Sequence, residues 1–199
     1  KEITLKTQEK IAALLGDVAL PLIGFLFWKW SFYFIALYFI FDQLARFLFL
    51  PTRIKKAEIE AYLKWSMLLK MGFLLCIESA LIILINTQII ADFNPIIGLQ
   101  KFFFYKDMGI EQGYILIPLL FLSEWMRLKN DIVLKKTPEM LRLDIHKTMQ
   151  QNQFRLIFFS LMLFIVSFIK LNEWIVVVWF LSMIAFLNLI PNKKSQEKA

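Results

Sequence analysis

The stretch SFYFIALYFIFDQLARFLFL occupies residues 31–50 and contains two charged residues, Asp42 and Arg46. Twenty largely apolar residues are the length that an α-helix needs to cross the hydrocarbon core of a bilayer. A helix on the surface of a soluble protein would instead show polar residues every three or four positions along one face. The stretch has no such face, so it predicts a membrane-spanning helix.

The composition of the whole chain agrees with this prediction. Hydrophobic residues make up 59% of the 199 residues, charged residues make up 20%, and the mean hydropathy is +0.61. Soluble domains have about 45–50% apolar and about 25% charged residues. A soluble domain of this size leaves much of its surface exposed to water, so the apolar excess indicates a chain that lies in lipid.

Further apolar stretches lie on both sides of the first one. We expect a single all-α transmembrane domain over residues 1–199, with about six spans arranged as three hairpins. The predicted spans cover approximately residues 11–28, 31–50, 66–91, 109–128, 154–169 and 174–190.

The positive charges predict the orientation of these spans. The net charge is +7, and most Lys and Arg residues fall in the N-terminus, in residues 53–64, in residues 127–155 and in the C-terminal tail. If the spans alternate in direction, these four segments lie on one side of the membrane. The loops on the opposite side contain only Lys29, Lys101, Lys106 and Lys170. The positive-inside rule then predicts that both termini are cytoplasmic. We expect the protein to lie in the inner membrane of a bacterium. Because the charge flanks apolar stretches, we expect contact with the lipid bilayer and no binding of nucleic acid.

Two connections between the predicted spans are longer than turns. Residues 92–107 include the aromatic run FFFY between two lysines and are predicted to lie at the outer membrane surface. Residues 129–151 are predicted to form a cytoplasmic amphipathic segment, with a helix that begins at Thr137 and Pro138. The apolar side chains of this amphipathic helix are predicted to dock a partner or lipid headgroups: Met140, Leu141, Ile145 and Met149.

The N-terminal region lacks the pattern of a cleavable signal peptide.

Charged residues inside the apolar spans are the candidate functional residues. A charge near the bilayer centre is costly, so such residues usually face the protein interior and have partners. Two acid–arginine pairs have helical spacing, Asp42 with Arg46 and Glu124 with Arg127. Glu78 lies near the middle of its span and has no obvious local counter-charge. The complete set is Asp17, Asp42, Arg46, Glu78, Glu124 and Arg127.

These charges are open to three interpretations. They can be paired groups that fix helix register, with Arg46 and Arg127 extending to the headgroups. They can be a proton or cation path along Asp17, Asp42 and Glu78. They can also form polar faces that dock another membrane subunit. Glu78 distinguishes these interpretations best, since a lipid-facing Glu78 would imply a partner helix and a Glu78 in a wet cavity would favour transport.

Catalytic and metal chemistry have little support in the sequence. The chain has one histidine, His146, and one cysteine, Cys76, so a multi-ligand metal site is not expected. Glycine occurs only 6 times and in no phosphate-binding loop. We therefore expect no enzyme activity and no cofactor.

The order of several segments resembles an uncharacterised bacterial polytopic membrane family. The segments are LPLIGFLFWKWSFYFIALYFIFDQLARF (residues 20–47), FFFYKDMGIEQGYILIPLLFLSEWMRLKND (102–131) and FRLIFFSLMLF (154–164). The resemblance implies a Trp-containing outer turn, an acid in the second span at Asp42, and an aromatic, Gly-containing stretch before the fourth span. The family tends to have histidines where this chain has Lys106, Gln112 and Ser160, and it has no assigned activity.

From these features we predict an accessory or scaffolding subunit of an inner-membrane complex, in contact with other membrane subunits. The alternative is a small proton- or ion-coupled transporter that uses the buried acids of the first four spans. A third interpretation is an intramembrane or lipid-handling enzyme.

Overall fold

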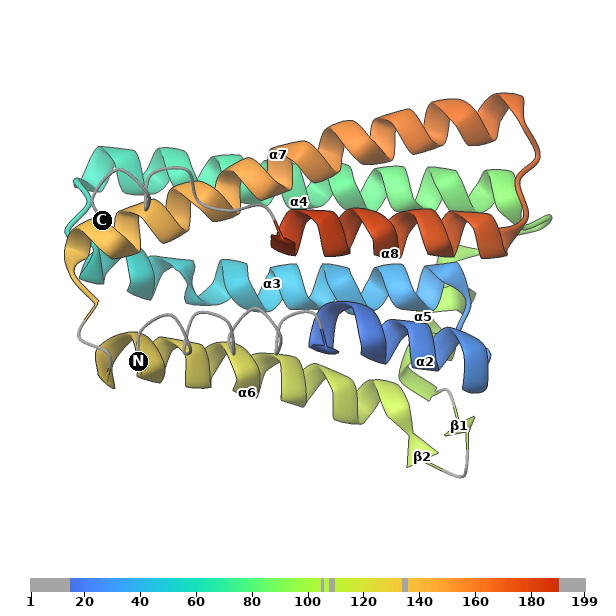
Figure 1. Cartoon of the computed structure of the whole chain (residues 1–199), viewed down its shortest axis with the longest axis horizontal. Coiled ribbons are helices and arrows are strands. Elements are labelled where there is room, and N and C mark those ends of the chain that lie inside the picture. The colour runs from blue at the N-terminus through green and yellow to red at the C-terminus, as the bar shows by residue number, and fades with distance from the viewer. Residues whose placement is uncertain (1–14, 105, 108–109, 134–135, 190–199) are drawn as a thin grey trace. The chain divides into compact units, whose positions relative to one another are not determined.

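The computed structural model describes residues 15–104, 106–107, 110–133 and 136–189, and these residues are mostly helical (Figure 1). A short π-helix, η1 (Leu15–Ala19), precedes the first α-helix. The strands β1 (Lys106–Asp107) and β2 (Ile110–Glu111) form a small antiparallel pair. The predicted all-α class is confirmed for the described residues. The α-helices are α2 (Leu20–Phe27), α3 (Phe32–Lys56), α4 (Ala61–Ile89), α5 (Pro95–Phe104), α6 (Gln112–Val133), α7 (Pro138–Phe168) and α8 (Glu173–Leu189).

Three of these helices are long and apolar enough to cross a membrane, namely α3, α4 and α7. Two shorter apolar helical stretches, Gly16–Phe27 and Glu173–Asn188, coincide with the first and last predicted spans. The fourth predicted span falls on α6. The first four residues of the first predicted span and both basic tails lie outside the described residues.

The chain divides into two compact units, Lys1–Phe32 with Leu171–Ala199 and Tyr33–Lys170. In the second unit, α4 and α7 pack along each other, and α5 packs against α6. There α3 lies between α6 and the α4–α7 pair (Figure 1). The main neighbour of α4 is therefore α7 and not α6, its partner in the predicted second hairpin.

Helix α3 continues past the predicted end of its span. The prediction stopped at Leu50, because Pro51 removes a backbone hydrogen bond and disfavours a helix interior. In the structure Pro51 lies inside α3. Ile54 and Ala57 are fully buried in a core formed with α4 and α7. Arg142 of α7 donates from Nε to the carbonyl of Ala57 (2.7 Å), so the end of the helix is held by tertiary contacts that outweigh the cost of the proline.

Helix α7 starts as predicted but does not end where the amphipathic segment was expected to end. The hydroxyl oxygen of Thr137 accepts a hydrogen bond from the backbone N–H of Met140 (3.3 Å), and Pro138 occupies the first turn. The helix then runs without interruption to Phe168. The amphipathic segment and the fifth predicted span are thus parts of one helix.

The predicted docking face on α7 is corrected by the burial of its side chains. Leu141 and Ile145 are 5% and 3% exposed and belong to the core shared with α3 and α4. Met149 packs against the same core. Only Met140 is exposed, because it lies about 100° around the helix from Leu141. The apolar stripe holds α7 to its own chain.

The connection at residues 92–107 contains a helix rather than an irregular loop. The side chain of Asn94 accepts hydrogen bonds from the backbone N–H groups of Ile96 and Ile97, which begins α5. Phe102 is fully buried, with its ring 4.5 Å from that of Phe34 on α3. Aromatic packing therefore fixes the segment that the sequence placed at the outer surface.

In the first unit, the turn after α2 depends on a glycine. The backbone N–H of Trp30 donates to the carbonyl of Gly24 (3.0 Å), and the indole ring lies directly over Gly24. A Cβ atom on Gly24 would overlap this ring, whereas a Cβ on Gly16 would meet no atom of the described residues within 4 Å. The close approach requires a glycine at position 24.

Gly24→Ala should lower the free energy of unfolding by about 1–3 kcal/mol, the usual cost of overpacking. The measurement is denaturant unfolding of the purified protein in detergent, with Gly16→Ala as the matched control. We expect Gly16→Ala to be as stable as the parent or slightly more stable. Equal stability of the two variants would contradict the packing described here.

Candidate functional site

The charged residues of α3 and α6 meet between the two helices. Asp42, Arg46 and Arg53 are separated by four and seven residues, so they share one face of α3. Glu124, Arg127 and Asp131 are separated by three and four residues and share one face of α6. These two faces oppose each other and are joined by long side chains.

Glu124 is the centre of this arrangement. Its side chain is 3% exposed, and its carboxylate oxygens lie 3.1 Å from Arg53 Nη2, 3.2 Å from Arg127 Nη1 and 3.7 Å from Arg46 Nε. Arg46 also pairs with Asp42 at 2.8 Å. The predicted pairs Asp42–Arg46 and Glu124–Arg127 are therefore both present, and the structure brings them together in one cluster.

The cluster extends to the start of α7 through Asp131. The carboxylate of Asp131 lies 3.8 Å from Arg53 Nε and 2.8 Å from Lys136 Nζ. Lys136 also pairs with Asp144 of α7 at 3.0 Å. We call the whole set the polar clamp, and its acids and bases are equal in number: Asp42, Glu124, Asp131 and Asp144 against Arg46, Arg53, Arg127 and Lys136.

Lys136 lies in the connection between α6 and α7. Burial lowers the pKa of Lys136, but its hydrogen bonds with Asp131 and Asp144 and the charges of these acids raise the pKa more. The net pKa is above the ordinary value of 10.5, so the ammonium group stays charged at neutral pH. It therefore bridges α6 to α7 as a permanent cation.

Glu78 has a counter-charge that the sequence analysis missed. Arg155 Nε lies 3.4 Å from Glu78 Oε1, and both residues are buried. Arg155 also donates a hydrogen bond to the side-chain oxygen of Asn152. The pattern of loop charges places Arg155 among the cytoplasmic charges next to the fifth span. Its spacing from Asn152, three residues on a helix, is the signal that could have placed it on the face turned to α4.

Asp17 belongs to the first unit and is separate from the polar clamp. Its Oδ2 atom accepts a hydrogen bond from Asn188 Nδ2 of α8 at 3.1 Å. Asp17 is the candidate residue of the first predicted span, and Asn188 lies near the end of the last. A polar contact thus joins η1 to α8 within this unit.

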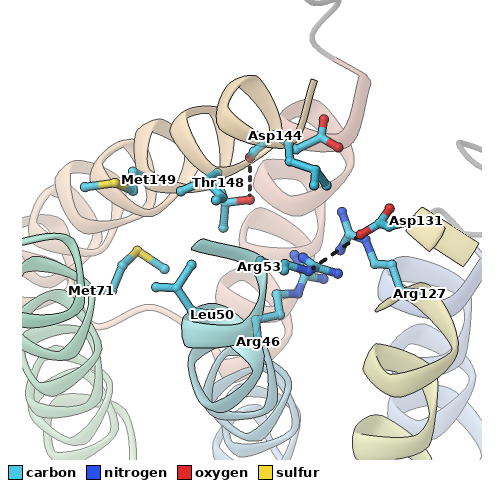
Figure 2. A pocket seen from close by; sticks show the side chains of 11 residues that line it. Arg46, Leu50, Arg53, Met71, Arg127, Asp131, Asp144, Thr148 and Met149 are labelled. Carbon is cyan, nitrogen blue, oxygen red and sulfur yellow. Dashed lines mark hydrogen bonds and ion pairs between the residues drawn. The ribbon is translucent and has the colours of Figure 1, made fainter. Parts of the chain in front are cut away.

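A small pocket opens beside the polar clamp, between α3, α6 and α7 (Figure 2). Arg46 and Arg53 extend from α3 towards Arg127 and Asp131 of α6, as Figure 2 shows. The volume of the pocket is about 20 Å³, which is enough for a water molecule. The remaining lining residues are Leu50, Met71, Leu141, Asp144, Ile145, Thr148 and Met149.

The other chemistry-bearing side chains lie apart from this cluster. Cys76 is free and exposed, and His146 is exposed on α7. In the described part of the chain, no three His, Cys, Asp or Glu side chains are grouped so that they could hold a metal ion. The arrangement can hold helices together by charge and can present guanidinium groups to an anion.

Glu124→Gln should lower the free energy of unfolding by about 3–5 kcal/mol, because it removes the buried carboxylate charge that three arginines share. The measurement is denaturant unfolding in detergent. Glu139→Gln, at an exposed acid in the first turn of α7, is the control and should change stability by at most about 1 kcal/mol. If the two variants lose the same stability, Glu124 does not organise the cluster.

The Glu78–Arg155 pair should show energetic coupling in a double-mutant cycle. Glu78→Gln and Arg155→Gln each leave one buried charge, whereas the double variant leaves none. The double variant should therefore be more stable than the sum of the single effects, by about 0.5–3 kcal/mol.

A second cycle serves as the reference for the first. Glu78→Gln combined with Lys70→Gln, an exposed lysine on the same helix, should be additive. Additive effects in both cycles would show that Glu78 and Arg155 do not interact.

The chain matches no protein-family model, no curated protein and no solved structure. The resemblance to a bacterial polytopic membrane family therefore stays a prediction.

Proposed function

We propose that the protein is an accessory or scaffolding subunit of an inner-membrane complex, without catalytic activity of its own. In this proposal the chain crosses the membrane about six times with both termini in the cytoplasm, as the apolar stretches and loop charges predict. The observation that carries the proposal is the binding of Glu124 by three arginines. That geometry suits a carboxylate that holds helices in place.

The partners of the other candidate acids support the same role. Glu78 contacts Arg155, Asp42 contacts Arg46, and Asp17 contacts Asn188. A proton path requires acids that gain and lose protons in sequence, whereas each of these acids has a partner that suits a fixed carboxylate. The pairing of Glu78 with Arg155 matters most, since a Glu78 in a wet cavity would have favoured transport.

The exposed apolar side chains support a position in lipid. On α7 they follow helical spacing at Ile157, Leu161, Phe164 and Phe168, each at least 50% exposed. A soluble protein rarely exposes apolar patches of this extent, and their usual neighbours are lipid or another membrane helix. A scaffolding subunit would use part of this surface for a partner and leave the rest to the acyl chains.

The proposal is tested by purifying the tagged full-length chain from its native membrane in a mild detergent and measuring the mass of the intact particle. We expect a complex in which a second membrane protein is present in fixed stoichiometry. Recovery of a 23.6 kDa monomer that carries only lipid would contradict the proposal.

A flux measurement separates this proposal from the transporter alternative. The purified chain in liposomes should give no proton-coupled flux above that of protein-free liposomes. Flux that is abolished by both Asp42→Asn and Glu78→Gln would favour transport and overturn the scaffolding role. Lys70→Gln, at an exposed lysine outside the polar clamp, is the control for a general effect of removing a charge.

A further inference from the structure

The pocket beside the polar clamp has two unlike walls. One wall carries the guanidinium groups of Arg46, Arg53 and Arg127 (Figure 2). The other is apolar and includes Leu141 and Ile145 of the amphipathic part of α7. A site with a cationic wall and an apolar wall suits a ligand that is both anionic and apolar.

Arg53 has hydrogen-bond donors that its neighbours leave unused. Within the described residues, its Nε and Nη2 atoms are buried and donate no hydrogen bond. Nε lies 3.8 Å from Asp131 and Nη2 lies 3.1 Å from Glu124. These contacts are ion pairs, but their geometry is not that of hydrogen bonds. A buried donor without an acceptor is destabilising, so an additional anionic oxygen at this position would be stabilised.

The lining residues include three guanidinium groups and the carboxylates of Asp131 and Asp144. Glu124 does not line the pocket but contacts all three arginines, so an anion would share their donors with Glu124. A guanidinium group presents parallel N–H donors that match two oxygens of a phosphate. Arg127 is 47% exposed and lies at the rim, where it can close over such a group.

We propose that this pocket binds the phosphate group of an anionic phospholipid. Its small volume admits one phosphate oxygen beside Arg53, with Arg127 on the outer oxygens and the glycerol carbons on the apolar wall. The site lies where α3 ends and α7 begins, next to the basic residues that are predicted to face the anionic cytoplasmic leaflet. This binding site goes beyond the scaffolding role and does not depend on it.

The test is native mass spectrometry of the full-length chain in nanodiscs, with phosphatidylglycerol or phosphatidic acid titrated into phosphatidylcholine. We expect saturable binding of one anionic lipid. Arg127→Gln, and Arg53→Gln if it folds, should weaken this binding about tenfold, the effect of losing one charge-assisted hydrogen bond. Lys55→Gln is the control, because Lys55 lies in the same last turn of α3 but does not line the pocket.

A second arm separates a lipid from a free ion. Inorganic phosphate is titrated against the chain in phosphatidylcholine alone, where binding should be negligible. Arginine-dependent binding of free phosphate without binding of anionic lipid would overturn the lipid assignment. Equal lipid affinity of the parent, Arg127→Gln and Lys55→Gln would overturn the site itself.

Discussion

The contact between Glu124 and three arginines is the interaction on which the larger unit depends. Helices α3 and α6 approach each other through charged side chains, and a buried carboxylate without a counter-charge would be strongly unfavourable there. Arg46 and Arg53 on α3 and Arg127 on α6 supply that counter-charge. The same cluster continues through Asp131 to Lys136 and so reaches α7. One network of charges thus sets the positions of three helices at one end of the unit.

Away from this end, different interactions hold the helices. Aromatic rings fix α5 against α3, with Phe102 between Phe34 and Phe41. The ion pair of Glu78 with Arg155 joins α4 to α7. At the same end as the polar clamp, Leu141 and Ile145 add apolar packing against the end of α3. In lipid the hydrophobic effect does little to bring helices together, so close packing and polar contacts of this kind supply the specificity.

The local parts of this arrangement could be predicted from the sequence, and the long-range parts could not. Spacing along one helix revealed the pairs Asp42–Arg46 and Glu124–Arg127, and the first turn of α7 followed from Thr137 and Pro138. The partners of Glu78 and Arg53 lie on other helices, 77 and 71 residues away, and no local pattern reports such contacts. The end of α3 predicted from Pro51 is wrong, because contacts from α7 compensate for the cost of a proline inside the helix. The sequence predicts that Leu141 and Ile145 dock a partner or lipid headgroups, because an amphipathic pattern does not say which surface it covers.

The most direct test of the account is the distance between α3 and α6 with and without the charge of Glu124. Spin labels at the exposed positions Leu48 and Leu119, introduced as cysteines after Cys76→Ser, would report this distance by double electron–electron resonance in nanodiscs. The parent chain should give one narrow distance distribution, and Glu124→Gln should give a broader one or one centred at a longer distance. The same narrow distribution in both would contradict the conclusion that the polar clamp positions these helices.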